Sequence, residues 1–385
     1  MNNNFKRIIS SVLTVIMLFG LVCNSAVFPA YAADACGYDP AKTMSELDLS
    51  GEDAQAGNSY SISTVDELTS FAKYVNAGKP TDGTTFYLTS DIKLTGDTWT
   101  PIGSKSATAF KGVFDGCGYA VLKLTVDSQE NNQALFGYVS GSAAEIKNLG
   151  VEGTLKAKTN SAGIVANLDG AMIANSWNAV DVTGTYNVGG IAANVNGGTI
   201  TNCTNYAYIS GTSGVGAIAG SISGKSTVEY SYHVYYSADK GVGSQSGSNT
   251  QSVYRFSSSS TEVLAEKELT VGGKTSDNML TLLNEWLDMQ EKGHNYRTWV
   301  FDTSTNSKHR VDGNYPSLEY PDYIAPTEST YTATSTMTAL YEAKQNAVDG
   351  GCYSISSTDE IKYFRDYVNQ GFKTDGVVFF QNADI

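Results

Sequence analysis

Short apolar segments recur along the middle of the chain at a nearly constant spacing. One set is centred on glycines, which are separated by 163 − 137 = 26, 190 − 163 = 27 and 216 − 190 = 26 residues. Each segment of a second set ends in Asn and recurs at nearly the same spacing, and each segment of a third set ends in Gly. The segments are Phe136–Val139, Gly163–Ala166, Gly190–Ala193 and Gly216–Ala219; Ile146–Asn148, Ile173–Asn175 and Ile200–Asn202; and Val151–Gly153, Val182–Gly184 and Ile209–Gly211. The pattern predicts three short strands in each unit, with turn residues between them.

A repeat of this kind predicts an all-β fold, a right-handed parallel β-helix with coils of about 27 residues. Each coil would stack about 4.8 Å from the next through parallel backbone hydrogen bonds, so that neighbouring coils bury each other's apolar residues. Asn148, Asn175 and Asn202 would then form a ladder of amides at one corner. The repeated glycines suit corners that need either a positive φ or a close backbone approach. An antiparallel β-sandwich is the alternative, although the strands of a sandwich do not recur at one fixed period.

Short helices are predicted to cover both ends of the β-helix, where open strand edges would otherwise pair with other chains. Thr64–Glu67 has the form of a capping box, and the helix that follows ends at Gly78. A second amphipathic helix stops near Gly293, and two closing strands follow it. The apolar faces consist of Val65, Leu68, Phe71, Ala72 and Val75 and of Met279, Leu282, Leu283, Trp286 and Leu287, and the closing strands are Trp299–Phe301 and Tyr315–Leu318.

A much longer repeat relates the two ends of the chain. The segment from Tyr60 to Ile92 matches the segment from Tyr353 to Ile385 without a gap, at an offset of 353 − 60 = 293 residues. About half of the matched positions are identical, so the chain is expected to break off inside a second copy of its own domain. Residues 353–385 are then expected to form a strand and a helix without a partner sheet. The expected division is a signal peptide at 1–32, an N-terminal segment at 33–59, the β-helix domain with its C-terminal helical cap at 60–323, a linker at 324–352 and the start of the second copy at 353–385.

The N-terminus has the pattern of an export signal. Lys6 and Arg7 precede an apolar run from Ile8 to Val22, and Ala30–Ala32 provides a small-x-small cleavage site. A membrane anchor is the alternative, but the run is short for a span of about 20 residues. No other stretch of the sequence is apolar enough to cross a bilayer. The mature chain is therefore expected outside the cell, either secreted or on the cell surface.

The charge balance and the cysteines exclude several classes of function. The formal net charge is −14, which disfavours nucleic acid and anionic lipid as partners, because both attract basic surfaces. Cys36, Cys117, Cys203 and Cys352 share no spacing pattern and are interpreted as small core residues. With no C-x-x-C pair, a zinc or redox site is not expected, and the sequence indicates no cofactor.

The glycine-centred segments and the motifs around them resemble the GLUG-motif repeat of bacterial surface proteins. The motifs that carry the resemblance are Asp91–Leu94, Pro101–Gly103, Phe110–Gly116, Leu135–Gly137, Leu283–Trp286 and Tyr315–Leu318. The resemblance covers about Tyr60 to Tyr323 and implies a β-helix on the surface of Gram-positive bacteria, mostly gut Firmicutes. The same repeat occurs in the N-terminal region of some IgA-specific metallopeptidases. The chain departs from the motif at Val215–Gly220, and the middle repeats have Ala-Asn in place of a second Gly; the motif itself carries no catalytic residue.

A catalytic β-helix needs carboxylates stacked on one face of neighbouring coils. The repeat register provides no such pair, because neither Asp169 nor Asp181 meets a second acid one coil further on. Asp115 is interpreted as a turn cap. His233 lies in a strand-like run and is interpreted as a hydrogen-bonded histidine, not a base. The sequence therefore predicts no catalytic residue and no metal site in this chain.

Glycan binding fits the sequence better than catalysis. The repeat register directs Ala207 and Ile209 inward, so that Tyr206 and Tyr208 would point outward from one strand, with Trp177 nearby on the previous coil. Aromatic rings in such positions commonly stack on the apolar faces of sugars. The alternative is that these are ordinary surface residues of a chain with 24 tyrosines.

Two functions remain open from the sequence. The leading one is a non-catalytic extracellular or cell-surface repeat module, an adhesin or spacer, that binds glycans weakly. Its partners would be host or cell-wall glycans or surface proteins. The alternative is an accessory region of a secreted peptidase or glycoside hydrolase whose catalytic domain lies beyond residue 385.

Overall fold

The structure is a computed structural model in which the chain divides into two compact units, one formed by Ala32–Asp322 and one that includes Tyr323–Ile385. It describes residues 38, 42–47, 52–96, 98–234, 237–256, 269–271, 274–276, 278–290, 295–300, 316–319, 335–346, 352–370, 372 and 378–381. The predicted signal peptide and Cys36 lie outside the described residues. Among the described helices, none is both long and apolar enough to span a membrane.

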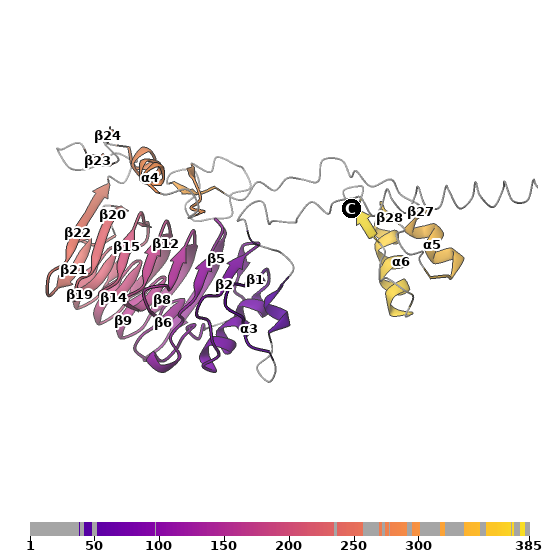
Figure 1. Ribbon diagram of the computed structural model, residues 1–385, viewed down its shortest axis with the longest axis horizontal. Coiled ribbons are helices and arrows are strands. Elements are labelled where there is room, and N and C mark those ends of the chain that lie inside the picture. The colour runs from indigo at the N-terminus through magenta and orange to yellow at the C-terminus, as the bar shows by residue number, and fades with distance from the viewer. Residues whose placement is uncertain are drawn as a thin grey trace, which may run out of the picture. The chain divides into compact units, whose positions relative to one another are not determined.

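The first unit is a parallel β-solenoid of about seven turns, roughly 27 residues each, so the predicted fold class is confirmed (Figure 1). Corresponding residues pair across consecutive coils, as in the series Ile146, Ile173 and Ile200. One face consists of β1 (Ser59–Ile62), β2 (Thr85–Leu88), β4 (Val113–Asp115), β7 (Glu145–Lys147), β11 (Met172–Ala174), β15 (Thr199–Thr201), β20 (Thr227–Val234) and β22 (Thr250–Phe256). The next face consists of β3 (Ile92–Lys93), β5 (Ala120–Asp127), β8 (Gly150–Lys156), β12 (Trp177–Thr183), β16 (Thr204–Asn205) and β17 (Ile209–Ser210), joined to the first through β20.

Two further sheets complete the circuit, so a regular coil has four strands and not the predicted three. They are β9 (Thr159–Ala162), β13 (Tyr186–Gly189) and β18 (Ser213–Gly216), and β6 (Phe136–Ser140), β10 (Val165–Asp169), β14 (Ala192–Asn196), β19 (Ala219–Ser223) and β21 (Val242–Gln245). The prediction was wrong here because the segment at Gly163, taken as one strand, is the corner between β9 and β10.

The glycines of that corner are required by close packing. A Cβ on Gly163 would lie 1.8 Å from Asn178 Oδ1, and a Cβ on Gly190 would lie 2.5 Å from Asn205 Cγ. Neither glycine lies in the left-handed region of φ. Of the two reasons that the sequence left open for these glycines, close approach therefore holds, because a side chain would displace the amide that crosses the interior of the coil.

The helix α3 (Val65–Asn76) begins with the predicted cap and covers the start of the solenoid, after the short 3-10 helix η1 (Met44–Glu46). Thr64 Oγ1 accepts a hydrogen bond from the backbone N–H of Glu67. The Glu67 carboxylate accepts from the backbone N–H of Ser63, one residue before the position that a standard capping box uses. The ring of Phe71 packs on Phe86 at a centroid distance of 4.5 Å, which joins the helix to the aromatic core of the first coils.

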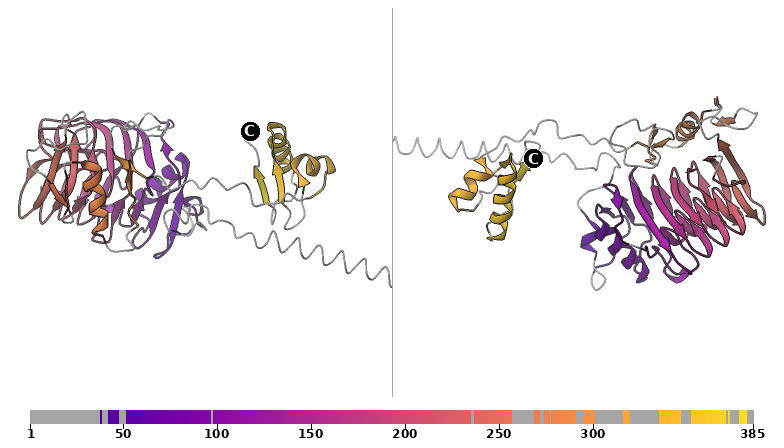
Figure 2. Two further views of the ribbon diagram at one scale, coloured as in Figure 1. Left: turned by 90° about the horizontal axis from the view of Figure 1, so that it is seen from above. Right: turned by 180° about the vertical axis from the view of Figure 1, so that it is seen from behind.

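The second predicted cap lies along the side of the solenoid, not over its far end (Figures 1 and 2). We call residues 278–290, 295–300 and 316–319 the flap. The flap contains α4 (Met279–Asp288) and the antiparallel pair β25 (Trp299–Val300) and β26 (Ser317–Leu318), which follow the hairpin β23 (Leu269–Val271) and β24 (Lys274–Ser276). Its apolar residues share one buried cluster with Ala120, Ala174, Trp177, Tyr206 and Tyr232. The expectation of an end cap was wrong because the face formed by these solenoid residues is itself apolar and needs a cover.

The second unit repeats the start of the first. It contains β27 (Ser335–Thr336), α5 (Met337–Ala343), β28 (Cys352–Ile355), α6 (Thr358–Asn369) and β29 (Val378–Gln381). Cys352 pairs with Val378 in parallel just as Ser59 pairs with Thr85, so both strands keep the offset of 293 residues. The expectation that this segment has no partner sheet was wrong, since β28 lies between β27 and β29. Part of the predicted linker also forms β27 and α5.

Candidate functional site

The three aromatic residues predicted to bind glycan do not form one exposed surface. Trp177 and Tyr206 are 1% and 5% exposed, whereas Tyr208 is 55% exposed. Tyr206 and Trp177 belong to the cluster under the flap, and Tyr206 Oη donates a 2.8 Å hydrogen bond to the carbonyl of Pro316. The expectation that Tyr206 is open to solvent was therefore wrong: the 27-residue register says which side chains leave the solenoid interior, but not what covers them.

The solenoid acids lie where the register predicted. Asp169 Oδ1 accepts a 2.8 Å hydrogen bond from Asn196 Nδ2 one coil on, and Asp181 Oδ1 accepts from the backbone N–H of Tyr208 at 3.0 Å. Each carboxylate thus faces an N–H donor on the neighbouring coil. Among the described residues, no group of three or more His, Cys, Asp or Glu side chains could hold a metal ion.

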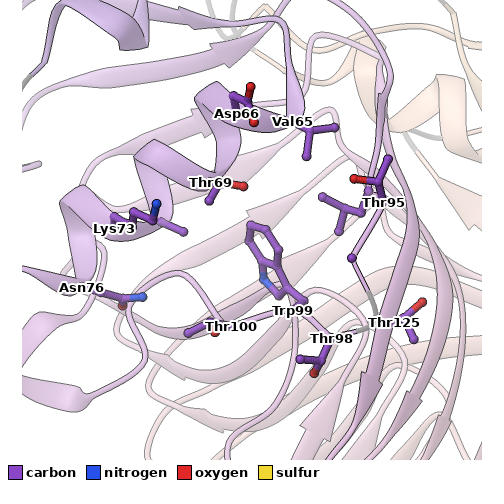
Figure 3. A pocket seen from close by; sticks show the side chains of 13 residues that line it. Val65, Asp66, Thr69, Lys73, Asn76, Thr95, Thr98, Trp99, Thr100 and Thr125 are labelled. Atoms are coloured by element: carbon purple, nitrogen blue, oxygen red, sulfur yellow. The ribbon is translucent and has the colours of Figure 1, made fainter.

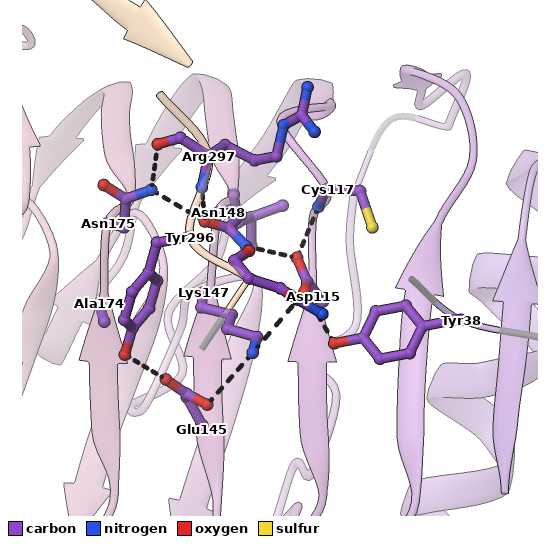
Figure 4. A network of polar contacts seen from close by, with 12 residues as sticks. Tyr38, Asp115, Cys117, Glu145, Lys147, Asn148, Ala174, Asn175, Tyr296 and Arg297 are labelled. Atoms are coloured by element: carbon purple, nitrogen blue, oxygen red, sulfur yellow. Dashed lines mark hydrogen bonds and ion pairs between the residues drawn. The ribbon is translucent and has the colours of Figure 1, made fainter. Parts of the chain in front are cut away.

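Asp115 is a fully buried carboxylate whose oxygens are held by several donors (Figure 4). Its Oδ1 accepts from the backbone N–H of Cys117 at 2.8 Å and from Asn148 Nδ2 at 2.9 Å, and its Oδ2 accepts from Tyr38 Oη at 2.9 Å. Burial raises the pKa of Asp115, and the Lys147 ammonium, 3.9 Å from Oδ2, is the main factor that opposes the rise. The bond to Cys117 is the predicted turn cap, and the bonds from Tyr38 and Asn148 tie two other segments to the same carboxylate.

The predicted Asn ladder exists and starts from Asp115. Asn175 Nδ2 donates to Asn148 Oδ1, and Asn202 Nδ2 donates to Asn175 Oδ1, each at 2.8 Å. The backbone of all three asparagines is in the left-handed conformation, with φ of 50°, 47° and 51° in chain order. Because every amide points its N–H groups toward Asp115, the aligned dipoles favour a negative charge at that end of the ladder.

The same asparagines bind the flap (Figure 4). Asn148 Nδ2 donates to the carbonyl of Asn295, and Asn148 Oδ1 accepts from the backbone N–H of Arg297, both at 2.9 Å. Asn175 Nδ2 donates to the carbonyl of Arg297 at 2.8 Å, and Asn175 Oδ1 accepts from Trp299 Nε1 at 2.6 Å. Asn148 and Asn175 therefore use both donors and both acceptor positions of their amides.

A second polar group beside the ladder also reaches the flap. Tyr296 Oη donates to Glu145 Oε1 at 2.9 Å, and the Lys147 ammonium lies 3.7 Å from Glu145 Oε2 and 5.7 Å from the centre of the Tyr296 ring. Burial and the neighbouring Glu145 carboxylate raise the pKa of the Tyr296 hydroxyl. These contacts satisfy buried charges and fix the flap.

His233 and the cysteines are likewise engaged in structure. His233 is buried and bonds the carbonyl of Val234 through Nδ1 at 3.1 Å, as a hydrogen-bonded histidine was expected to do. Burial lowers the pKa of His233 to about 4 and raises the pKa of the free, buried Cys203 to about 12. Cys203 is thus a small core residue, as predicted. Cys117 is also buried in an apolar cluster, and it is disulfide-bonded, which the sequence left open.

A groove that the sequence did not indicate runs along the outer flank of α3 (Figure 3). The groove has a volume of about 430 Å³ and lies between α3 and residues 94–96 and 98–100. Its floor is apolar, and hydroxyl groups surround it. The lining residues used below are Val65, Asp66, Thr69, Ala72, Lys73, Leu94, Thr95, Thr98, Trp99 and Thr100. The sequence pattern could not reveal the groove, because only the fold brings Trp99 and its neighbours together with α3.

Comparison with known proteins identifies no family for this chain. No protein-family model matches it, and no curated protein matches it. One solved structure is similar over 72% of this chain and 97% of its own: a protein from Bacteroides ovatus described as a "putative immunoglobulin A1 protease". The TM-score is 0.40 and the identity is 14%.

Proposed function

We propose that this chain is a non-catalytic module of an exported surface protein, in which a rigid β-solenoid serves as a spacer or adhesive arm. The observation that carries the proposal is that the buried polar side chains hold the fold together. Asp115, Asn148 and Asn175 direct their hydrogen bonds to neighbouring coils and to the flap, so the polar corner of the solenoid has a structural role. Charged groups that would serve catalysis need access to a substrate, which full burial denies to Asp115.

Export is supported by chemistry elsewhere in the chain. The N-terminal pattern is that of a signal peptide, and the disulfide at Cys117 is typical of proteins outside the reducing cytosol. The resemblance to GLUG-motif proteins of the Gram-positive cell surface is part of the same proposal.

Serial repetition supports the role of an arm. The strand register of the first unit recurs in the second at the same offset, down to the stacked pairs Tyr60–Phe86 and Tyr353–Phe379. Copies joined in series extend reach, and weak contacts made by several copies add up through their high effective concentration.

The proposal is tested by incubating the purified protein with a panel of polysaccharides and peptides and measuring product release. We expect no turnover above the buffer control. Turnover that disappears in Asp181→Asn or His233→Gln, while circular dichroism shows an intact fold, would contradict a non-catalytic role.

A further inference from the structure

We propose that the groove beside α3 is a binding site for a neutral sugar, with Trp99 as its floor. The inference rests on the proposed function and deepens it, because it gives the adhesive arm a binding site and a class of ligand. It also rests on the shape of the groove, on the chemistry of its walls and on a comparison with the second unit. At about 430 Å³ the groove falls toward the small end of the roughly 300–1,000 Å³ that is usual for small-molecule sites.

The floor of the groove is rigid and apolar (Figure 3). Trp99 is held at two points, since Nε1 donates to the carbonyl of Leu135 at 3.0 Å and the backbone N–H donates to the carbonyl of Thr125 at 2.9 Å. Val65 and Leu94 line the groove together with it. A ring that is already fixed loses little conformational freedom on binding, and an indole surface matches the apolar face of a sugar ring.

The walls of the groove offer hydroxyl groups. Thr95, Thr98 and Thr100 are exposed, and Thr69 is half-buried on α3. Within the described part of the chain, none of these four hydroxyls has a protein hydrogen-bond partner. Each can therefore both donate to and accept from a ligand hydroxyl.

The charges beside the groove favour a ligand without net charge. Asp66 and Lys73 lie two turns apart on the same flank of α3, and both are exposed. Neither forms an ion pair with another described residue. One carboxylate and one ammonium cancel in their long-range field, while the net charge of −14 repels anions, so acidic sugars are disfavoured.

The second unit shows that part of the groove lining can change while the helix is kept. At the offset of 293 residues, four buried positions of α3 stay apolar in α6, whereas three positions that line the groove carry a different charge and two, Asp66 and Asn76, keep the same residue. Leu68, Phe71, Tyr74 and Val75 correspond to Ile361, Phe364, Tyr367 and Val368, and Thr69, Ala72 and Lys73 correspond to Lys362, Arg365 and Asp366. The same helix scaffold thus accepts a long charged side chain at the position of Thr69, so this position is not fixed by packing.

This internal comparison supplies a variant that should fold. The change Thr69→Lys copies a residue that the same helix carries in α6, and it places one long cationic side chain in the groove. Ala72 is left unchanged because it is buried in the core. Ser70→Lys adds the same side chain outside the groove lining and serves as the matched control. Replacing Trp99 directly is a weaker test, because this residue is 9% exposed and its loss would disturb packing.

The experiment is a glycan array of neutral and sialylated oligosaccharides, followed by titration of the purified protein with the strongest neutral ligand. We expect binding of neutral oligosaccharides with millimolar Kd, weakened at least tenfold in Thr69→Lys and unchanged in Ser70→Lys. No neutral ligand on the array, or equal binding by wild type and Thr69→Lys, would overturn the proposal. A product-release assay on the same samples reports separately on the non-catalytic role.

Discussion

Trp299 Nε1 donates a 2.6 Å hydrogen bond to Asn175 Oδ1, although the two residues are 124 positions apart in the chain. This bond joins the flap to the amide ladder of the solenoid. The ladder thus does two things at once: it links consecutive coils, and it presents a row of donors and acceptors to the backbone that crosses it.

Loss of one ladder member is expected to destabilise the fold strongly. Asn175→Ala leaves the hydrogen-bond partners of the amide unpaired in a buried site. It also places an alanine at a φ of 47°, a conformation that asparagine tolerates better. We expect a loss of about 3–5 kcal/mol in the free energy of unfolding, measured by urea denaturation. Asn187→Ala is the control, because Asn187 has a φ of 51° but lies on the less buried corner that bonds Asn160. A loss for Asn175→Ala no greater than for the control would contradict the role of the ladder.

The ladder can be extended by one coil. Tyr230 occupies the position that follows Asn202 in register and is left-handed at a φ of 47°. The buried Oδ1 of Asn202 has no hydrogen-bond partner among the described residues. Tyr230→Asn should supply the missing donor, whereas Tyr230→Gly relieves the same backbone strain without one. We expect the Asn variant to be more stable than the Gly variant by about 1 kcal/mol in thermal unfolding. Equal stabilities would show that the ladder ends at Asn202 for another reason.

Acidification should destabilise the protein through His233. Its pKa is about 4 in the fold, against 6.5 as the ordinary value, so the neutral imidazole is the folded form. The contribution of the neutral His233 to the free energy of unfolding is complete above pH 6.5. It is lost as pH falls from 6.5 to 4, by on the order of 3 kcal/mol. The raised pKa of Asp115 acts in the opposite direction, but it is common to wild type and His233→Gln. Between pH 7 and pH 4, we expect the free energy of unfolding to fall less in the variant than in wild type, as measured by thermal unfolding. Equal losses in the two proteins would contradict this.

Two glycine substitutions distinguish close packing from backbone conformation as the reason for the repeated glycines. Gly163→Ala would place a Cβ 1.8 Å from Asn178 Oδ1, whereas a Cβ on Gly170, which has a φ of 66°, would have no other atom within 4 Å. We expect Gly163→Ala to cost about 3 kcal/mol or more, and Gly170→Ala only about 1 kcal/mol, in chemical denaturation. The reverse order would show that backbone conformation, not close approach, explains the repeated glycine.

The sequence predicted what depends on the 27-residue period and missed what does not. The fold class and the stacking of Asn148, Asn175 and Asn202 follow from one register, because each coil repeats its neighbour. The position of the flap depends on contacts such as that of Tyr206 with Pro316, 110 residues away, for which no repeat exists. Burial of Tyr206 could therefore not be predicted. The groove was missed because Trp99 and the flank of α3 belong to different elements that only the fold brings together.

The polar corner of the solenoid holds the flap, and a double-mutant cycle tests this claim most directly. The cycle compares the free energies of unfolding of Asn175→Ala, Trp299→Phe and the double variant. We expect the two changes to be coupled by about 1 kcal/mol or more, while Asn187→Ala combined with Trp299→Phe is additive within about 0.5 kcal/mol. Additivity for Asn175 and Trp299 would contradict the claim.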